Sequence, residues 1–433
     1  MLGRRTISRR DFLKIGGAGL AGAALLGAAG CGGGGSSSNN VVFSMGRDAT
    51  GTLPKLIDKF NKENKGKFQV TFREMPTDTG QYFDKLQTEF QAGQTDIDVI
   101  GGDVIWGAQF AANKWIQDIS DKFPESEQSQ FLPAPIQTAT YQGKIYGVPW
   151  YTDAGMLYYR KDLLQKSGFS APPKTWDELQ SMAQTVTQQS GLPYGFVFQG
   201  SNYEGGVCDA LEYIWSTGGD VLQGDKIVID SPQAVAGLTT EHSMITSGAA
   251  PKAVSTYTEQ ETDPAFMGGK AVFARNWPYM FSEAGSSDYP KVKPDMVGVA
   301  PIPVSQQGMQ SYSCLGGWNM YISALSDKQD QAWEFVKWLT APEQMKWRAI
   351  NATLLPARKS LYSDQEILSQ VPVIRLGKDI IPNTKPRPVS PYYSDMSLKM
   401  QEQFNSSLKG SVSPQQAAKT LQQELTNIQQ QAQ

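Results

Sequence analysis

From residue 41 onward, short apolar segments alternate with segments of helical periodicity, and this alternation constrains the fold more than any other feature of the chain. The first apolar segments have polar or glycine borders, as strands do, and occupy residues 41–45, 68–72 and 96–102. Four apolar residues lie at helical spacing between the first two segments: Leu53, Leu56, Ile57 and Phe60. Strand–helix–strand units of this kind predict a parallel sheet covered by helices, and therefore an α/β fold.

The same alternation starts again near residue 156, and no linker rich in proline, glycine and serine separates the two units. Strand-like segments follow at residues 156–159, 226–230, 271–274 and 297–302. Thr175 and Glu178 form a capping-box pattern, which predicts the start of a helix. Further helices are predicted over residues 326–340 and 413–428. We therefore expect two lobes joined by ordered crossings, an arrangement suited to a cleft that opens and closes.

Residues 1–30 have the features of an export signal and are left out of the fold prediction. The segment Ser8-Arg9-Arg10-Asp11-Phe12-Leu13-Lys14 resembles a twin-arginine signal, and the apolar run after it is shorter than a membrane span. Ala28-Ala29-Gly30-Cys31 resembles a lipoprotein signal-peptidase site, with Ala28 where leucine is usual. This implies a lipid on Cys31, followed by a flexible Gly/Ser/Asn-rich tether over residues 31–40. An ordinary cleaved signal, with Cys31 lost or idle, is the alternative.

The composition argues against several classes of protein. The formal net charge is −3 and no basic block follows the N-terminus, so we expect no nucleic-acid partner. The single histidine, His242, has no accompanying Gly-x-Ser-x-Gly motif. The sequence has no Cys/His pattern with metal spacing and no glycine-rich phosphate motif, so we expect neither a metal nor a cofactor.

Two cysteines remain after the signal, Cys208 and Cys314. An exported protein reaches a compartment where disulfides persist, so one bridge between them is possible. Two buried free thiols are the other interpretation, and the sequence leaves both open.

Several further motifs follow one another in order along the chain. They are residues 143–150 (GKIYGVPW), 156–164 (MLYYRKDLL), 172–179 (PPKTWDEL), 211–215 (LEYIW), 266–272 (FMGGKAV) and 355–358 (LPAR). By these motifs the chain, from residue 41 to its end, resembles the extracellular solute-binding proteins of carbohydrate ABC importers. Three segments resemble the trehalose/maltose-binding branch: residues 274–279 (ARNWPY), 315–319 (LGGWN) and 386–393 (PRPVSPYY).

The resemblance implies a two-lobed fold of the periplasmic-binding-protein type (class II), with three crossings between the lobes. Residues 41–152 and 311–351 then form the N-terminal lobe, and residues 153–310 and 352–433 form the C-terminal lobe. The implied function is capture of an α-linked disaccharide, such as trehalose or maltose, and its delivery to the permease subunits of an ABC importer. We expect a monomer, held by its lipid on the outer face of the cytoplasmic membrane.

Candidate sugar-binding residues follow the predicted strands, at the carboxyl ends where open α/β sheets bind ligands. Arg47 and Asp48 follow the first strand, and Asp103 and Trp106 follow the third. Asp153 lies at the first predicted crossing. Charged groups make strong hydrogen bonds to sugar hydroxyls, and aromatic rings offer flat apolar faces to the C–H patches of a sugar ring.

Trp277 follows the strand at residues 271–274 and matches a stacking tryptophan of the family. The resemblance adds a final group of binding residues: Gly316, Gly317, Trp318, Arg387 and Tyr392. A secreted glycoside hydrolase is the main alternative function, because two carboxylates such as Asp103 and Asp153 suffice for that chemistry. A sensory ectodomain that reports sugar to a membrane receptor is a further alternative.

Overall fold

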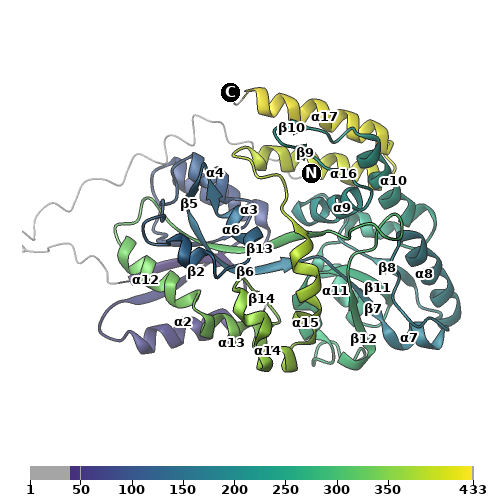
Figure 1. The fold of residues 1–433 in the computed structure, drawn as a ribbon, viewed down its shortest axis with the longest axis horizontal. Coiled ribbons are helices and arrows are strands. Elements are labelled where there is room, and N and C mark those ends of the chain that lie inside the picture. Colours follow the sequence, from purple (N-terminus) through teal and green to yellow (C-terminus); the bar gives the residue numbers. More distant parts are fainter. Residues whose placement is uncertain (1–39, 49, 432–433) are drawn as a thin grey trace, which may run out of the picture. The chain divides into compact units, whose positions relative to one another are not determined.

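The computed structural model of the chain describes residues 40–48 and 50–431 (Figure 1). Its larger sheet has seven strands: β1 (Asn40–Gly46), β2 (Gln69–Met75), β3 (Val99–Asp103), β6 (Gly147–Ala154), β13 (Ser313–Ile322), β14 (Leu355–Pro356) and β15 (Thr384–Lys385). The spatial order is β14-β6-β13-β3-β1-β2, and β15 pairs with β13. β1 runs parallel to β2 and β3, whereas β13 is antiparallel to β3 and β6. The predicted α/β class is confirmed.

Apolar cores lie on both faces of this sheet, because successive strand residues point to opposite sides. On one face, Val99 packs with α2 (Thr52–Glu63) and α12 (Gln329–Leu339). On the other face, Ile100 packs with α3 (Thr79–Gln91) and α4 (Gly107–Ala112). The four apolar residues expected at helical spacing are all buried on α2: Leu53, Leu56, Ile57 and Phe60.

The second sheet has four strands in the order β12-β7-β11-β8. They are β7 (Met156–Arg160), β8 (Tyr194–Val197), β11 (Ala271–Asn276) and β12 (Val297–Ala300). Five helices belong to the same part of the chain: α7 (Lys161–Lys166), α8 (Trp176–Ser190), α9 (Glu204–Ser216), α10 (Pro232–Thr246) and α11 (Glu259–Met267). The C-terminal helices α16 (Tyr393–Leu408) and α17 (Pro414–Gln431) pack beside α9 and α10 (Figure 1).

Shorter elements connect these parts. They are α5 (Glu125–Gln128), α6 (Pro133–Thr138), β4 (Thr140–Tyr141), β5 (Lys144–Ile145), β9 (Leu222–Gln223), β10 (Lys226–Ile227), α13 (Pro342–Ala352), α14 (Gln365–Gln370) and α15 (Pro372–Ile380). Five short 3₁₀ segments are also present: η1 (Lys252–Thr256), η2 (Pro278–Glu283), η3 (Pro294–Met296), η4 (Lys359–Ser363) and η5 (Ile381–Asn383).

The chain passes from one sheet to the other directly after β6. Gly155 alone separates β6 from β7, and a Cβ atom there would lie 1.9 Å from the Glu212 Oε1 atom. Only glycine fits, because the buried Glu212 and Arg275 side chains fill the space. The chain returns to the seven-stranded sheet between β12 and β13. The exact lobe boundaries stay predictions.

Local signals in the sequence have clear counterparts in the structure. Thr175 and Glu178 form the expected capping box at the start of α8. The segment predicted as a strand over residues 226–230 pairs only at Lys226 and Ile227. In the part of the chain that the structure describes, no helix is both long and apolar enough to cross a membrane. The export signal and Cys31 lie outside the described residues.

Candidate functional site

β13 brings several predicted binding residues to one region, because it lies between β3 and β6. Its Trp318 is paired with Asp103 of β3, and its Gly316 is paired with Asp153 of β6. A Cβ atom on Gly316 would lie 3.1 Å from the Asp153 Cβ atom and 3.0 Å from the Trp277 ring. Asp153 and Trp277 therefore both lie against Gly316, although the three residues are far apart in the sequence.

Asp153 carries a carboxyl group that the protein itself leaves unused. Its Oδ1 atom is buried and has no hydrogen-bond partner among the residues that the structure describes. Burial raises the pKa of this carboxyl to about 8, and the nearby positive charge of Arg348 only partly opposes that rise. Buried polar atoms are nearly always satisfied in folded proteins, so this one leaves a hydrogen bond for a water molecule or a ligand to make.

The Trp277 indole is held on two sides by polar groups. Its Nε1 atom donates to Glu259 Oε1 at 2.9 Å, and the Arg275 guanidinium lies 4.1 Å from the ring centroid. Arg275 is fixed in turn by buried ion pairs to Glu212 at 2.7 Å and to Asp209 at 3.4 Å. The indole is thus held in place by residues of the chain itself.

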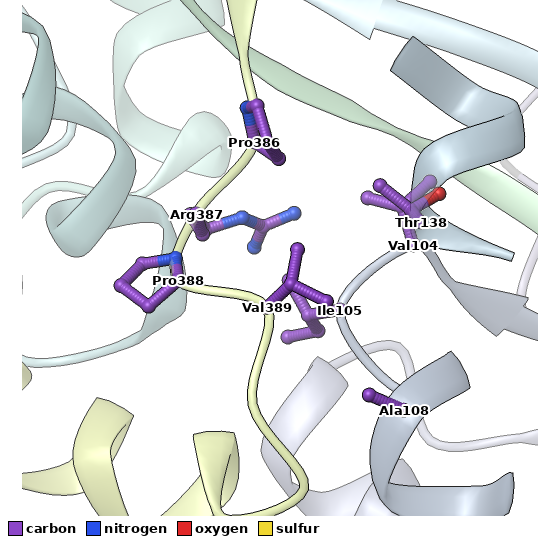
Figure 2. A pocket seen from close by; sticks show the side chains of 8 residues that line it. All are labelled: Val104, Ile105, Ala108, Thr138, Pro386, Arg387, Pro388 and Val389. Carbon is purple, nitrogen blue, oxygen red and sulfur yellow. The ribbon is translucent and has the colours of Figure 1, made fainter. Parts of the chain in front are cut away.

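Arg387 extends from the segment between Pro386 and Pro388 toward the loop that carries Val104 (Figure 2). Its Nη2 atom donates to Asp103 Oδ1 at 3.0 Å, and its Nη1 atom donates to Glu204 Oε1 at 2.8 Å. A small cavity of about 10 Å³, enough for roughly one water molecule, lies against the arginine. Arg387 therefore joins Asp103 of β3 to Glu204 of α9.

Burial dominates the electrostatics of this group. It raises the pKa of Asp103, and the negative charge of Glu204 adds to that rise, whereas Arg387 opposes it. The Arg387 Nε atom is buried and, within residues 40–48 and 50–431, has no hydrogen-bond partner. The arginine thus holds the carboxylates and still has one donor to offer.

Two of the predicted binding residues, Asp48 and Trp106, make their contacts within the protein. Asp48 accepts hydrogen bonds from the Leu53 backbone at 2.6 Å and from the Thr50 side chain at 2.6 Å, so it closes the turn before α2. Arg348 and these hydrogen bonds outweigh the effect of burial and lower the pKa of Asp48. Trp106 is packed into the core against Tyr82 and Phe110.

The other predicted residues are spread around the same strand. Arg47 is exposed directly after β1. Gly317 has φ +115°, and a Cβ atom there would lie 2.4 Å from the Tyr151 carbonyl oxygen. Trp318 is half-buried and stacks on Tyr82 with ring centroids 6.3 Å apart. Tyr392 is half-buried at the start of α16, and its backbone N–H donates to Ser390.

Cys208 and Cys314 are free, buried thiols in the structure, the second of the two interpretations that the sequence left open. A hydrogen bond to Cys314, together with burial, raises the pKa of the Cys208 thiol, so the two sulfur groups are neighbours. His242 contacts the Leu408 carbonyl at 3.1 Å. Among the described residues, no group of three or more His, Cys, Asp or Glu side chains is placed to hold a metal ion.

Sequence reasoning did not identify several polar residues around Asp153, Trp277 and Arg387. These are Glu204, Glu259, Arg275, Arg348 and Tyr362. Glu204 opens α9 and Arg348 lies within α13, where charged residues are ordinary. Their partners lie more than 100 residues away along the chain, so no local pattern marks them.

Comparison with known proteins places this geometry in a family context. The family model for bacterial extracellular solute-binding proteins matches residues 46–346. A probable ABC transporter-binding protein of Deinococcus radiodurans is 36% identical over 368 residues, which is 83% of this chain and 86% of that protein. A maltotriose-binding protein of Pyrococcus abyssi is 24% identical over 64% of this chain and 58% of its own length.

Solved structures match along nearly the whole described chain. A maltose-bound protein of T. maritima is 37% identical, with a TM-score of 0.83 over 90% of this chain and 99% of the other. A ribitol complex of an ABC transporter solute-binding protein from Agrobacterium radiobacter is 26% identical, with a TM-score of 0.78 over 89% and 97%. The likeness extends over both sheets, and the fold is the open-sheeted, two-lobed fold of these binding proteins.

Proposed function

This chain belongs to the bacterial extracellular solute-binding proteins, and from that membership we propose that it captures an α-linked glucose disaccharide, trehalose or maltose. As a member of the family it is the sugar-binding component of an ABC transporter rather than an enzyme. It acts on the extracytoplasmic side of the membrane. The disaccharide and the residues that bind it form the proposal.

The unsatisfied Oδ1 atom of Asp153 is the observation that carries the proposal. It lies beside the fixed ring of Trp277 and the bare backbone of Gly316. A sugar hydroxyl bonded to the carboxyl group and a sugar face laid on the indole would satisfy both groups at once. Glycine at position 316 leaves room for that close approach.

A disaccharide, rather than a single ring, fits the extent of the polar groups. Asp153 and Trp277 form one group of the proposed binding site, and Asp103 and Arg387 form a second group. Leu315 and Gly316 of β13 lie between the two groups. The T. maritima relative is described with bound maltose, which supports an α-linked glucose disaccharide. Trehalose has two equivalent rings, so both ends present the same hydroxyl pattern to such a pair of contacts.

Thermal unfolding of the purified protein with a panel of sugars tests the proposal. Trehalose and maltose should raise Tm, because a ligand that binds only the folded state stabilises it by mass action. Ribitol and tagatose, which occur in complexes of related proteins, serve as comparison ligands. The proposal fails if no di- or oligosaccharide raises Tm while an amino acid, peptide or metal does, or if glucose is released at catalytic rates.

We propose further that the protein is exported by the twin-arginine route and held at the membrane, as a monomer, by a lipid on Cys31. Cys31→Ser should therefore move the protein from the membrane fraction to the soluble fraction, because the acylated thiol is lost. Fractionation followed by immunoblotting measures the change. Cys208→Ser, which keeps Cys31, is the matched control and should still sediment with membranes. A Cys31→Ser protein that sediments like wild type contradicts the anchor.

A further inference from the structure

Arg348 of α13 is buried in an unusual way for a charged side chain. It is 3% exposed, and its guanidinium lies 3.8 Å from the Trp150 ring centroid and 5.1 Å from that of Tyr151. The Nε atom donates to Thr52 Oγ1 at 3.1 Å, and the Nη2 atom lies 3.6 Å from Asp48 Oδ1. The Nη1 atom is buried and has no hydrogen-bond partner within the described residues.

Arg358 shows that a stacked, buried arginine in this protein does not need to leave a donor unused. It is 7% exposed and lies 4.3 Å from the Phe131 ring centroid. Its Nε, Nη1 and Nη2 atoms donate to Thr340, Gln130 and Glu127 at 2.8–3.0 Å. Leaving a buried polar group unpaired is unfavourable, and more so when the group is charged. The free Nη1 atom of Arg348 therefore points to a partner from outside the chain.

Tyr362 of η4 adds a second unused group in the same region. Its ring is 8% exposed, and its hydroxyl is buried without a hydrogen-bond partner in the described part of the chain. η4 follows β14, which pairs with Tyr151 and Thr152 of β6, directly before Asp153. Burial raises the pKa of Tyr362, and the negative charge of Asp153 adds to the rise. Arg348, Tyr362 and Asp153 therefore share one polar region beside β6.

We propose that Arg348 Nη1, the Tyr362 hydroxyl and Asp153 Oδ1 form one subsite that binds two neighbouring hydroxyls of a single sugar ring. This inference rests on the proposed function and names residues that bind one ring of the proposed disaccharide. A sugar hydroxyl both donates and accepts, so it needs an acceptor such as Asp153 beside a donor such as Arg348. Asp48 holds the guanidinium in place, which reduces the entropy lost on binding.

The charges of the subsite select a neutral ligand. Arg348 supplies one positive charge, which Asp48 balances, and Asp153 is largely uncharged at neutral pH because burial raises its pKa to about 8. A sugar acid or sugar phosphate would bury its negative charge beside an arginine that is already paired, and an unpaired buried charge is costly. The subsite therefore fits the uncharged vicinal diol of a pyranose, not its oxidised or phosphorylated form.

Isothermal calorimetry with trehalose and maltose tests the subsite. Arg348→Met keeps a long side chain but removes the guanidinium with its donors, and should weaken binding of whichever sugar binds the wild type by about 10- to 100-fold. Tyr362→Phe removes one oxygen and should weaken binding about 3- to 10-fold. Because that oxygen has no partner in the unliganded protein, the Tm of Tyr362→Phe without sugar should match the wild type.

Two control variants make the same chemical changes away from the subsite. Arg358→Met removes a stacked arginine whose donors are all paired, and Tyr213→Phe removes another buried hydroxyl that has no partner in the described residues. Both should bind sugar like the wild type. The inference is overturned if Tyr362→Phe and Arg348→Met keep wild-type affinity, or if glucuronic acid or trehalose phosphate binds more tightly than trehalose. If the wild type binds neither disaccharide, the proposed function fails first and this inference falls with it.

Discussion

Replacing Arg387 by alanine is expected to lower the free energy of unfolding by about 3–5 kcal/mol, because it leaves two buried carboxylates without their shared partner. Asp103 and Glu204 are paired with Arg387 at 3.0 Å and 2.8 Å, and all three side chains are largely buried. The same change should weaken sugar binding by about 100-fold, since a charged donor is lost. Urea unfolding without sugar measures the first effect, and calorimetry measures the second.

The control for this prediction is Arg160→Ala, which removes an arginine whose ion pair, within the described residues, is with its near neighbour Asp162. That change should cost less than about 1 kcal/mol, as partly exposed ion pairs do. A triple variant with Arg387→Met, Asp103→Asn and Glu204→Gln should recover part of the lost stability, because no unpaired charge remains. A cost below about 1 kcal/mol for Arg387→Ala would show that the buried ion pairs do not hold this region together.

Asp153→Asn is expected to have opposite effects on binding and on stability. Measured above pH 8, where the carboxyl is ionised, sugar affinity should fall by about 10- to 100-fold, because a neutral amide replaces a charged acceptor. The unliganded protein, by contrast, should gain about 1–3 kcal/mol above pH 8, where the wild type must hold a buried, unsatisfied charge. Functional sites commonly reduce the stability of the fold in this way.

The sign of the pH dependence follows from the raised pKa. Burial raises the pKa of Asp153 to about 8, against about 4 in an unfolded chain. Between these two values the folded state binds the proton more strongly, so wild-type stability is lost as the pH rises from about 4 through about 8. Thermal unfolding at pH 5, 7 and 9 should show a smaller loss for Asp153→Asn. Asp330→Asn, at an exposed position, is the matched control. An equal slope for wild type and Asp153→Asn would be inconsistent with a buried, titrating Asp153.

The elements of the fold were predictable where the signal is local. Leu53, Leu56, Ile57 and Phe60 are buried on α2 as their spacing indicates, and the Thr175 capping box starts α8. β13 was not predicted as a strand from periodicity, because both of its faces are covered and its central residues are glycines. Such a strand has no alternating pattern of apolar and polar residues, so its formation depends on pairing with strands that are distant in the sequence.

The site was partly predictable for the same reason. Asp153 lies near the end of β6 and Trp277 directly follows β11, and the structure brings both against Gly316. Asp48 also follows a strand, but its carboxylate accepts hydrogen bonds from the turn before α2 and pairs with Arg348. From the sequence, a carboxylate with such a structural role looks the same as one that binds a ligand. Arg348 itself has no sequence signal, because its unpaired nitrogen is a property of the packed structure alone.

The central position of β13 has a consequence for how the chain is made. The ribosome completes β3 and β6 long before residues 313–322, yet these two strands are joined only through β13. Until then each presents an open edge, which is the kind of surface that pairs with other chains. The final helices, α16 and α17, must also be synthesised before α9 and α10 are covered. Folding of the whole domain therefore comes at the end of synthesis, and its nonlocal strand pairing makes it slow.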